Sequence, residues 1–338
     1  MSRRHSAVPP PVTAVLDAAS AWLPTRLGAV ETRLREATGG YGPSLERDAK
    51  ATLLAGGKRL RPLLVLLCGG APGGDPAVRA ATAVELVHMA TLVHDDVLDD
   101  APLRRGRPTV AATSGRDHAT ATGDLLFSRA FAMLAESGDT NQVALLSEAS
   151  VALARGELSQ RHDEYDTAIT AERYMERCRL KTARLFECAC LMGWTARTGA
   201  GAAAGPDGSG GEAELRAFGS EIGLAFQLLD DVLDVTGPPD RTGKARGTDL
   251  LDGTVTLPLI VAMQLDPALA GVELRDLEPA DAAQICDRIA ATGALDEVRA
   301  RAMEMVSAAK RILSGPAFDE EQRSLLEMVA DGIVDRYG

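Results

Sequence analysis

Apolar residues recur at intervals of three and four positions along most of the chain from about Thr13 onward. This spacing matches the period of an α-helix, so helices are the dominant predicted element. Helices are predicted at residues 12–37, 45–56, 62–69, 76–99, 119–136, 140–163, 171–198, 212–236, 258–265, 279–291, 293–314 and 319–336. Two interruptions, the glycine-rich 199–211 and the charged 237–253, are predicted to be surface loops.

The composition agrees with an all-α fold. Alanine and aliphatic residues are abundant, whereas the 338 residues include only two Trp, four Tyr and six Phe, which favours helices packed on helices. No linker is long enough to separate two domains. Residues 12–338 are therefore expected to form one helical domain, and the basic, proline-rich residues 1–11 a disordered tail. No apolar stretch approaches about twenty residues, so no transmembrane segment is expected.

Charge and cysteine content narrow the expected partners and compartment. The net charge of −12 argues against a nucleic-acid-binding surface. The five cysteines form no Cys-x-x-Cys pair, which predicts free thiols and makes a zinc site unlikely. Free thiols are typical of a reducing compartment, so a cytoplasmic location is expected.

A short acidic phrase, Asp-Asp-x-x-Asp, occurs twice within apolar, helix-like sequence. Its aspartates are Asp95, Asp96 and Asp99 in the first copy, and Asp230, Asp231 and Asp234 in the second. On a helix the first and last carboxylates of each phrase lie about one turn apart on one face. Either phrase alone is equally consistent with a solvated helix face.

The apolar sequence before each phrase argues against a solvated helix face, because helices so apolar are buried. Clustered buried carboxylates must be paired or bound to metal, since like charges otherwise raise one another's pKa. Two such helices facing each other would hold Mg²⁺ ions between acidic walls. Mg²⁺ prefers oxygen ligands and often shares them with substrate phosphates, so a phosphorylated ligand is expected there.

Cations cluster near these acidic phrases. Three occur in the sequence GGKRLRP at 56–62, which opens a predicted helix, and others follow each acidic phrase. Arginine binds phosphate through two donors, and helix N-termini favour anions, so this set predicts anion binding. The candidates are Lys58, Arg61, Arg104, Arg105 and Lys244. Any single arginine is equally consistent with a solvated or salt-bridged surface residue.

Four further polar residues lie in apolar helical sequence near these motifs. His88 lies two turns before Asp95 on the same helical stripe, and Gln227 lies one turn before Asp230. Lys181 and Thr182 are adjacent in an apolar helix. An amphipathic surface position is the alternative for Lys181. The amide of Gln227 can direct a dipole at developing positive charge.

Together these motifs resemble the trans-isoprenyl diphosphate synthases, most closely the bacterial all-trans polyprenyl diphosphate synthases of the octaprenyl type. The motifs that carry the resemblance are GGKRLRP (56–62), ELVHMATLVHDDVLDDAPLRRGRPT (85–109), TGDLLFSRAF (122–131), GE (156–157), LKTARLFECAC (180–190) and GLAFQLLDDVLDVTG (223–237). The resemblance implies a single all-α domain around a central cavity, usually a homodimer, that condenses isopentenyl diphosphate with an allylic diphosphate using Mg²⁺.

The resemblance also implies a role for each candidate residue. The metal ligands would be Asp95, Asp99 and Asp230, supported by Asp96, Asp231 and Asp234. Isopentenyl diphosphate would be bound by Lys58, Arg61, His88 and Arg105. The allylic diphosphate would contact Arg104, Lys181 and Lys244. Thr182 and Gln227 would face the reacting carbons. The catalytic residues would be Lys181, Thr182 and Gln227.

One position departs from the family's pattern. Thr254 stands where the family commonly has a lysine, in the phrase Asp249-Leu-Leu-Asp-Gly-Thr-Val-Thr-Leu-Pro258. One cation near the allylic diphosphate is therefore missing. Weaker binding of the allylic substrate, or a shifted preference, is expected.

Small residues one turn before the first acidic phrase predict the product length. The chain is expected to grow beside this helix, where Ala90 and Thr91 would form the first floor of the cavity. Short-chain members of the family usually carry aromatic residues there, so a product longer than C20 is predicted. Roughly three helix residues match the length of one isoprene unit, which gives a product of about six to ten units. Phe127 or Phe131 is the candidate for a deeper stop.

Four alternatives stay open on the sequence. A short-chain (farnesyl or geranylgeranyl) synthase shares every motif. A class I terpene cyclase shares the helical cavity but normally replaces the second acidic phrase and lacks the GGKRLRP cluster. A regulatory subunit of a heteromeric synthase tends to lose the acidic phrases. An acidic helical scaffold without chemistry leaves the cation cluster unexplained.

Overall fold

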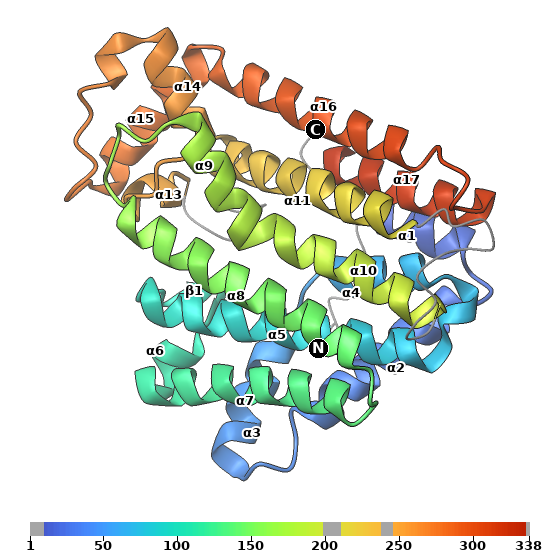
Figure 1. Ribbon diagram of the computed structural model, residues 1–338. Helices are drawn as coiled ribbons and strands as arrows, with labels where there is room; N and C mark the ends of the chain where they lie inside the picture. The colour runs from blue at the N-terminus through green and yellow to red at the C-terminus, as the bar shows by residue number, and fades with distance from the viewer. Residues whose placement is uncertain (1–9, 199–210, 238–245, 336–338) are drawn as a thin grey trace, which may run out of the picture.

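The computed structural model describes residues 10–198, 211–237 and 246–335, and these form a layered helical bundle (Figure 1). Its α-helices are α1 (Pro10–Ala18), α2 (Leu23–Ala37), α3 (Pro43–Leu54), α4 (Leu60–Gly69), α5 (Gly74–Leu98), α6 (Val110–Ser114), α7 (Arg116–Ala135), α8 (Thr140–His162), α9 (Ala171–Cys178), α10 (Arg184–Thr198), α11 (Gly211–Thr236), α13 (Thr248–Leu251), α14 (Leu257–Leu265), α15 (Pro279–Ala291), α16 (Ala294–Ile312) and α17 (Glu320–Asp335). The predicted all-α class is confirmed, and the predicted first helix is in fact two, because Pro24 begins a new helix after a break.

A two-stranded hairpin follows the first acidic phrase, which the sequence analysis did not predict. Strands β1 (Leu103–Arg104) and β2 (Arg107–Pro108) pair antiparallel, so Arg105 and Gly106 form the turn. Both turn residues have positive φ, at 53° and 71°, as a two-residue hairpin turn of this twist requires. The hairpin turns the chain back toward α5 and holds two arginines of the cation cluster there.

The predicted helix at 171–198 is interrupted in the middle. Residues Arg179–Ala183 form a π-helical turn between α9 and α10. Such turns insert an extra residue per turn and occur frequently at functional sites. This one contains both Lys181 and Thr182.

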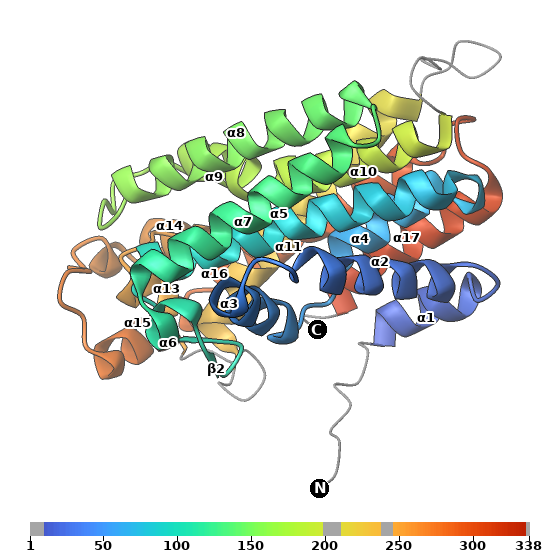
Figure 2. The ribbon, with the colours of Figure 1, turned by 90° about the horizontal axis from the view of Figure 1, so that it is seen from below.

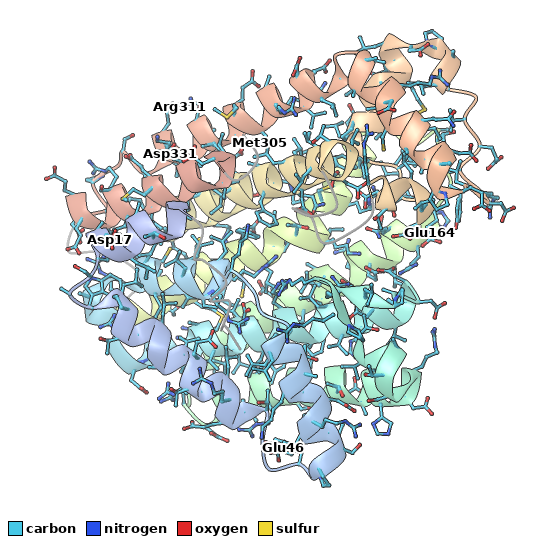
Figure 3. All side chains as sticks on the ribbon, turned by 180° about the vertical axis from the view of Figure 1, so that it is seen from behind. Asp17, Glu46, Glu164, Met305, Arg311 and Asp331 are labelled. Carbon is cyan, nitrogen blue, oxygen red and sulfur yellow. The ribbon has the colours of Figure 1, made fainter. Side chains whose placement is uncertain are left out.

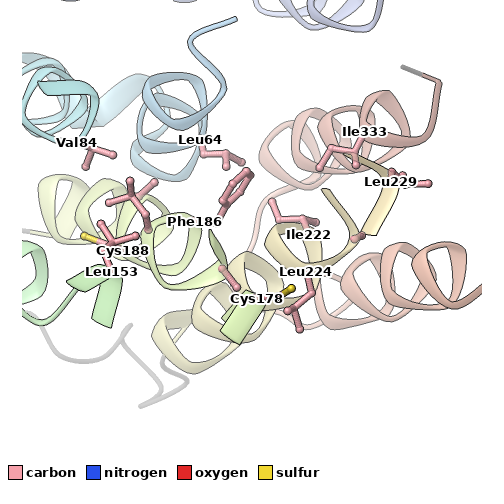
Figure 4. Packing of buried hydrophobic residues seen from close by; sticks show 14 of the residues in the cluster. Leu64, Val84, Leu153, Cys178, Phe186, Cys188, Ile222, Leu224, Leu229 and Ile333 are labelled. Carbon is pink, nitrogen blue, oxygen red and sulfur yellow. The ribbon is translucent and has the colours of Figure 1, made fainter. Parts of the chain in front are cut away.

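Helix α10 lies at the centre of the core. It packs against α4, α5, α8 and α11, and Figure 4 shows its Phe186 between Leu64 of α4 and Ile222 of α11. One continuous set of buried apolar residues extends from Val15 near the start to Ile333 near the end of the chain. Because α10 contacts both α5 and α11, it fixes how the two helices that carry the acidic phrases are placed.

Glycines allow the helices around the π-turn to approach closely. A Cβ on Gly223 of α11 would lie 2.7 Å from Ala183 Cα, and one on Gly156 of α8 would lie 2.7 Å from the backbone nitrogen of Lys181. Both distances are shorter than any real Cβ contact. The π-turn is therefore held between α8 and α11 by two positions that only glycine fits.

The C-terminal ends of α5, α8 and α11 lie at one end of the bundle, together with α9, α13 and the hairpin (Figures 1 and 2). Figure 3, seen from behind, labels Glu164 at the same end. Both acidic phrases occur at helix C-termini, so this arrangement brings them to one end. No helix within the described ranges has the length and apolar character needed to cross a membrane. All five cysteines are unpaired and buried, as predicted for free thiols.

Replacing Gly156 by alanine is expected to destabilise the protein by about 1–3 kcal/mol, because the new methyl group overpacks against the π-turn. Gly28→Ala in α2 is the matched control, since a Cβ there meets nothing within 4 Å. Urea unfolding of both variants measures the effect. A Gly156→Ala protein as stable as the Gly28→Ala protein would contradict the close packing.

Candidate active site

A cavity of about 270 Å³ lies at the end of the bundle where the acidic phrases meet. Asp95 and Asp99 of the first phrase line it, and so do Asp230 and Asp231 of the second. The two helices thus present carboxylates to one space, and α10, which packs on both, holds them in place. The remaining lining comes from α4, α8, α9, α10, the π-turn, the hairpin and the segment that includes α13.

The carboxylates that face this cavity differ in their surroundings. Removal from water raises the pKa of Asp95 to about 6, and the nearby Glu157 and Asp99 carboxylates act in the same direction, while Lys181 opposes them. Asp99 forms an ion pair with Arg161 of α8. Asp230 is exposed on the cavity wall. The cavity therefore holds negative charge that a cation would stabilise.

Asp96, Asp231 and Asp234 are joined to neighbouring segments by hydrogen bonds. Asp96 is buried and accepts a hydrogen bond of 2.6 Å from Arg104 Nε. Asp231 is buried and accepts hydrogen bonds from the Tyr174 hydroxyl and, at 2.7 Å, from Gln227 Nε2. Asp234 does not line the cavity; its Oδ2 accepts the backbone N–H of Asp249 at 3.2 Å. These three hold the surrounding structure in place.

The donor set suits a hard divalent cation shared with a ligand. Among the residues that the structure describes, no three Asp, Glu, His or Cys side chains converge as a ready-made metal site. Mg²⁺ is usually bound through one or two carboxylates, several waters and substrate phosphates rather than by an all-protein cage. Asp95, Asp99 and Asp230, distributed over two walls of one cavity, fit that mode of binding.

Lys181, Thr182 and Gln227 lie on the same cavity wall. The Thr182 hydroxyl donates to Gln227 Oε1 at 2.7 Å, and Gln227 Nε2 donates to Asp231 Oδ1 at 2.7 Å. Because Asp231 takes the amide nitrogen, the carbonyl oxygen of Gln227 is directed toward Thr182. Lys181 forms an ion pair with Glu157 of α8. The network presents fixed oxygen dipoles and one ammonium group to the cavity.

Three of the predicted anion-binding residues, Arg61, Arg104 and Arg105, lie close enough to His88 to act on its charge. Arg61 lines the cavity beside His88, 3.3 Å from it, with its guanidinium 4.7 Å from the ring centre of Phe186. Burial lowers the pKa of Arg61 to about 10, and its Nε has no hydrogen-bond partner among the described residues. Burial, and then the nearby arginines, lower the pKa of His88 well below its usual value, so it is neutral at pH 7. Lys58 and Arg105 are exposed, and Lys244 lies outside the described residues. Lys58 does not line this cavity.

A second cavity of about 540 Å³ lies next to the first, between α3, α5, α6 and the hairpin. It shares His88, Leu92 and Arg104 with the first cavity. Its polar lining includes Arg59, Arg104, Arg105 and Arg107, and its remaining lining is largely apolar. Arg59 is engaged by Glu31 at 2.6 Å and by Glu85 at 2.8 Å, so it tethers the GGKRLRP segment. The site thus consists of two adjoining cavities that share three residues: the acidic cavity, and a second, arginine-rich one, the basic cavity, which Glu85 and Asp96 also line.

Several lining residues were missed by the sequence analysis. They are Arg161, Glu164, Tyr174, Arg177, Asp249 and Asp252; Glu157, beside the cavity, pairs with Lys181 and Arg161. Glu157 and Arg161 are one helical turn apart in a helix already quoted for its GE motif, so their spacing was a usable signal. Nothing in the sequence marked Tyr174 as a site residue, because a tyrosine on a helix face usually packs in the core.

Comparisons with known proteins identify the class. A model of the polyprenyl synthetase family matches residues 43–285. Component 2 of heptaprenyl diphosphate synthase from Geobacillus stearothermophilus is 37% identical, over 93% of this chain and 97% of that protein. A short chain isoprenyl diphosphate synthase from Methanothermobacter thermautotrophicus is 34% identical, over 90% of this chain and 95% of its own length.

The fold agrees with solved structures. A polyprenyl synthase from Caulobacter crescentus, complexed with calcium and isoprenyl diphosphate, superposes with a TM-score of 0.87 at 31% identity, covering 99% of this chain and 100% of that one. The architecture is therefore the all-α isoprenoid synthase fold. The chain belongs to the polyprenyl synthetase family and is a prenyltransferase, as the sequence motifs predicted.

Tyr174→Phe is expected to lower the free energy of unfolding by about 1–3 kcal/mol, because the buried Asp231 carboxylate loses a donor that nothing replaces. Tyr41→Phe is the matched control, since Tyr41 is 37% exposed. Chemical denaturation of both variants measures the difference. Equal stability of the two proteins would show that the Tyr174 hydroxyl does not support the network.

Proposed function

We propose that this chain catalyses Mg²⁺-dependent condensation of isopentenyl diphosphate with an allylic diphosphate, repeated to give an all-trans polyprenyl diphosphate longer than C20, about C30–C50. The observation that carries the proposal is the shared cavity, which both acidic phrases line together with Lys181, Thr182 and Gln227. Membership of the polyprenyl synthetase family supports the same reaction.

The acidic cavity is the proposed site of the allylic diphosphate. Asp95, Asp99 and Asp230 would bind Mg²⁺, with Asp96, Asp231 and Asp234 in support through the contacts described above. Bound Mg²⁺ would neutralise the diphosphate and make it a better leaving group. Lys181 and Arg104 would add cationic donors, joined by Lys244. The calcium and isoprenyl diphosphate in the Caulobacter crescentus structure support a divalent cation at such a site.

The basic side is the proposed site of isopentenyl diphosphate. Lys58, Arg61, His88 and Arg105 would bind its diphosphate. Of these, Arg61 lines the acidic cavity, next to the shared residue His88. Arg61 Nε is a buried donor without a partner among the described residues, which an anion would satisfy. Neutral His88 adds a donor without further positive charge. The wall of His88, Leu92 and Arg104 between the two cavities is where the two substrates would meet.

The chemistry follows from the oxygen dipoles in the network. As the allylic carbon–oxygen bond breaks, positive charge develops on the allylic carbons. The Thr182 and Gln227 oxygens, fixed by the hydrogen bonds of this network, would stabilise that charge with little reorganisation. The double bond of isopentenyl diphosphate then attacks the cation, and proton loss restores a double bond. The departing pyrophosphate can accept that proton.

The product length depends on what closes the acidic cavity. Thr91 lines it, whereas Ala90 is fully buried in the core and does not. The Thr91 hydroxyl donates to His88 O at 2.9 Å, so the surface there is effectively apolar. Leu153 of α8 and Leu185 of α10 also line this cavity, and Phe127 stacks on His94 at 5.8 Å between ring centres. A long product requires the chain to pass these side chains toward Phe127 or Phe131.

The runner-up is a short-chain synthase making farnesyl or geranylgeranyl diphosphate. The modest cavity volume and the short chain relative from Methanothermobacter thermautotrophicus favour it. We propose that the active form is a homodimer. The name "component 2" of the Geobacillus stearothermophilus relative raises the alternative that a second polypeptide is required.

Incubation of the purified chain with farnesyl diphosphate, isopentenyl diphosphate and Mg²⁺ tests the proposal. Products longer than C20, sized by chromatography, are expected from this chain alone, and removal of Mg²⁺ by a chelator should abolish them. A C20 end product would establish the short-chain alternative. No condensation, with activity restored by a partner polypeptide, would instead show that the chain is one component of a heteromer.

Thr91→Phe is expected to shorten the main product by several isoprene units, because a ring at this position fills the cavity one turn below Asp95. The same assay measures the change. Val151→Phe is the matched control, since Val151 is 58% exposed on α8. An unchanged product distribution from Thr91→Phe would place the growing chain elsewhere.

A further inference from the structure

Arg161 of α8 contacts three carboxylates at the edge of the acidic cavity. Its Nε donates to Glu157 at 3.0 Å and its Nη1 to Glu164 at 2.7 Å. Its Nη2 forms the ion pair with Asp99 of the first acidic phrase. Two of its nitrogens are thus anchored on its own side of the cavity, and the third reaches across to a proposed metal ligand.

Arg161 also lies near Thr254, the position where a lysine is expected. Both residues line the acidic cavity. The segment after α8 is attached to the segment before Thr254, because the backbone N–H of Tyr165 donates to Gly253 O at 2.8 Å. A Cβ on Gly253 would lie 2.3 Å from the Tyr165 ring, so the two segments are in direct contact.

These contacts allow Arg161 to exchange one of its three partners, Asp99, for another group. A divalent cation on Asp99 competes with the Arg161 guanidinium for the same carboxylate. Once Asp99 binds a cation, Nη2 of Arg161 loses its partner while Nε and Nη1 keep Glu157 and Glu164. An anchored guanidinium with one donor directed into the cavity is well suited to a diphosphate oxygen.

We propose that Arg161 is a further ligand of the allylic diphosphate and supplies the cation that Thr254 lacks. Its Nη2 exchanges Asp99 for a diphosphate oxygen when a divalent cation occupies Asp99. The inference rests on the proposed function, because it assumes that this cavity binds a diphosphate together with a divalent cation.

Binding of inorganic pyrophosphate in the presence of Mg²⁺, measured by calorimetry, is the primary test. Arg161→Leu should weaken this binding about tenfold to a hundredfold, as expected for a lost charge-assisted hydrogen bond. Binding of Mn²⁺ alone should not weaken, since Arg161 competes with the cation for Asp99. Arg155→Leu is the matched control, because Arg155 is an exposed arginine on the same helix.

Rescue distinguishes a ligand from a merely structural residue. The double variant Arg161→Leu/Thr254→Lys should recover most of the lost pyrophosphate affinity, and Thr254→Lys alone should lower KM for the allylic substrate by a smaller factor. Arg161→Leu should raise KM for the allylic substrate while KM for isopentenyl diphosphate is unchanged. Arg161→Lys, which keeps one charge without the fork, should show an intermediate loss and serves if the leucine variant does not fold.

Wild-type pyrophosphate affinity in folded Arg161→Leu or Arg161→Lys protein would overturn the inference, as would a loss that Thr254→Lys does not rescue. Failure of the proposed function gives a different result. In that case the wild-type chain itself neither binds pyrophosphate with Mg²⁺ nor forms any condensation product.

Discussion

The repulsion between carboxylates at one end of an apolar helical bundle is the constraint on which this structure depends. Asp95, Asp99, Asp230 and Asp231 share one small cavity, and burial raises the pKa of both Asp95 and Asp231. Neighbouring side chains reduce this repulsion by pairing with individual carboxylates. Arg161 contacts Asp99, and Tyr174 with Gln227 satisfies Asp231. Burial and mutual repulsion of these carboxylates favour a bound cation in this cavity.

The same compensation divides the six aspartates by role. The two phrases have identical spacing, but their aspartates have different partners. Asp96 accepts a hydrogen bond from Arg104 of the hairpin, and Asp234 accepts one from the backbone of Asp249 in α13. Asp231 orients Gln227, whose oxygen then faces Thr182. Aspartates at one spacing therefore differ in role: some line the cavity, one orients the Gln227 amide, and others hold neighbouring segments in place.

Most of the fold could be predicted from the sequence, because buried amphipathic helices leave a strong three- and four-residue period. Proline and glycine marked most helix ends, and the six motifs indicated the family. The π-turn could not be predicted from residue spacing; in the structure it packs closely against Gly156 of α8 and Gly223 of α11. The Tyr174–Asp231 bond and the Arg161–Asp99 ion pair could not be predicted either, because each joins helices far apart in the chain. The contacts of Arg161 with Glu157 and Glu164 are local, and their spacing was visible in the sequence.

Two arginines, one just before α4 and one in the hairpin turn, have strained backbone conformations, and this strain bears on engineering. Arg59 and Arg105 both adopt left-handed backbone conformations, at φ of 50° and 53°, which cost a non-glycine residue roughly 1–2 kcal/mol each. Glycine or asparagine would relax the backbone at either position, but would remove a guanidinium from the basic cavity. Thermostabilising searches that reward relaxed turns would favour these substitutions and remove those guanidinium groups, together with the ion pairs of Arg59 to Glu31 and Glu85. Backbone strain at the two arginines thus keeps positive charge at the basic cavity.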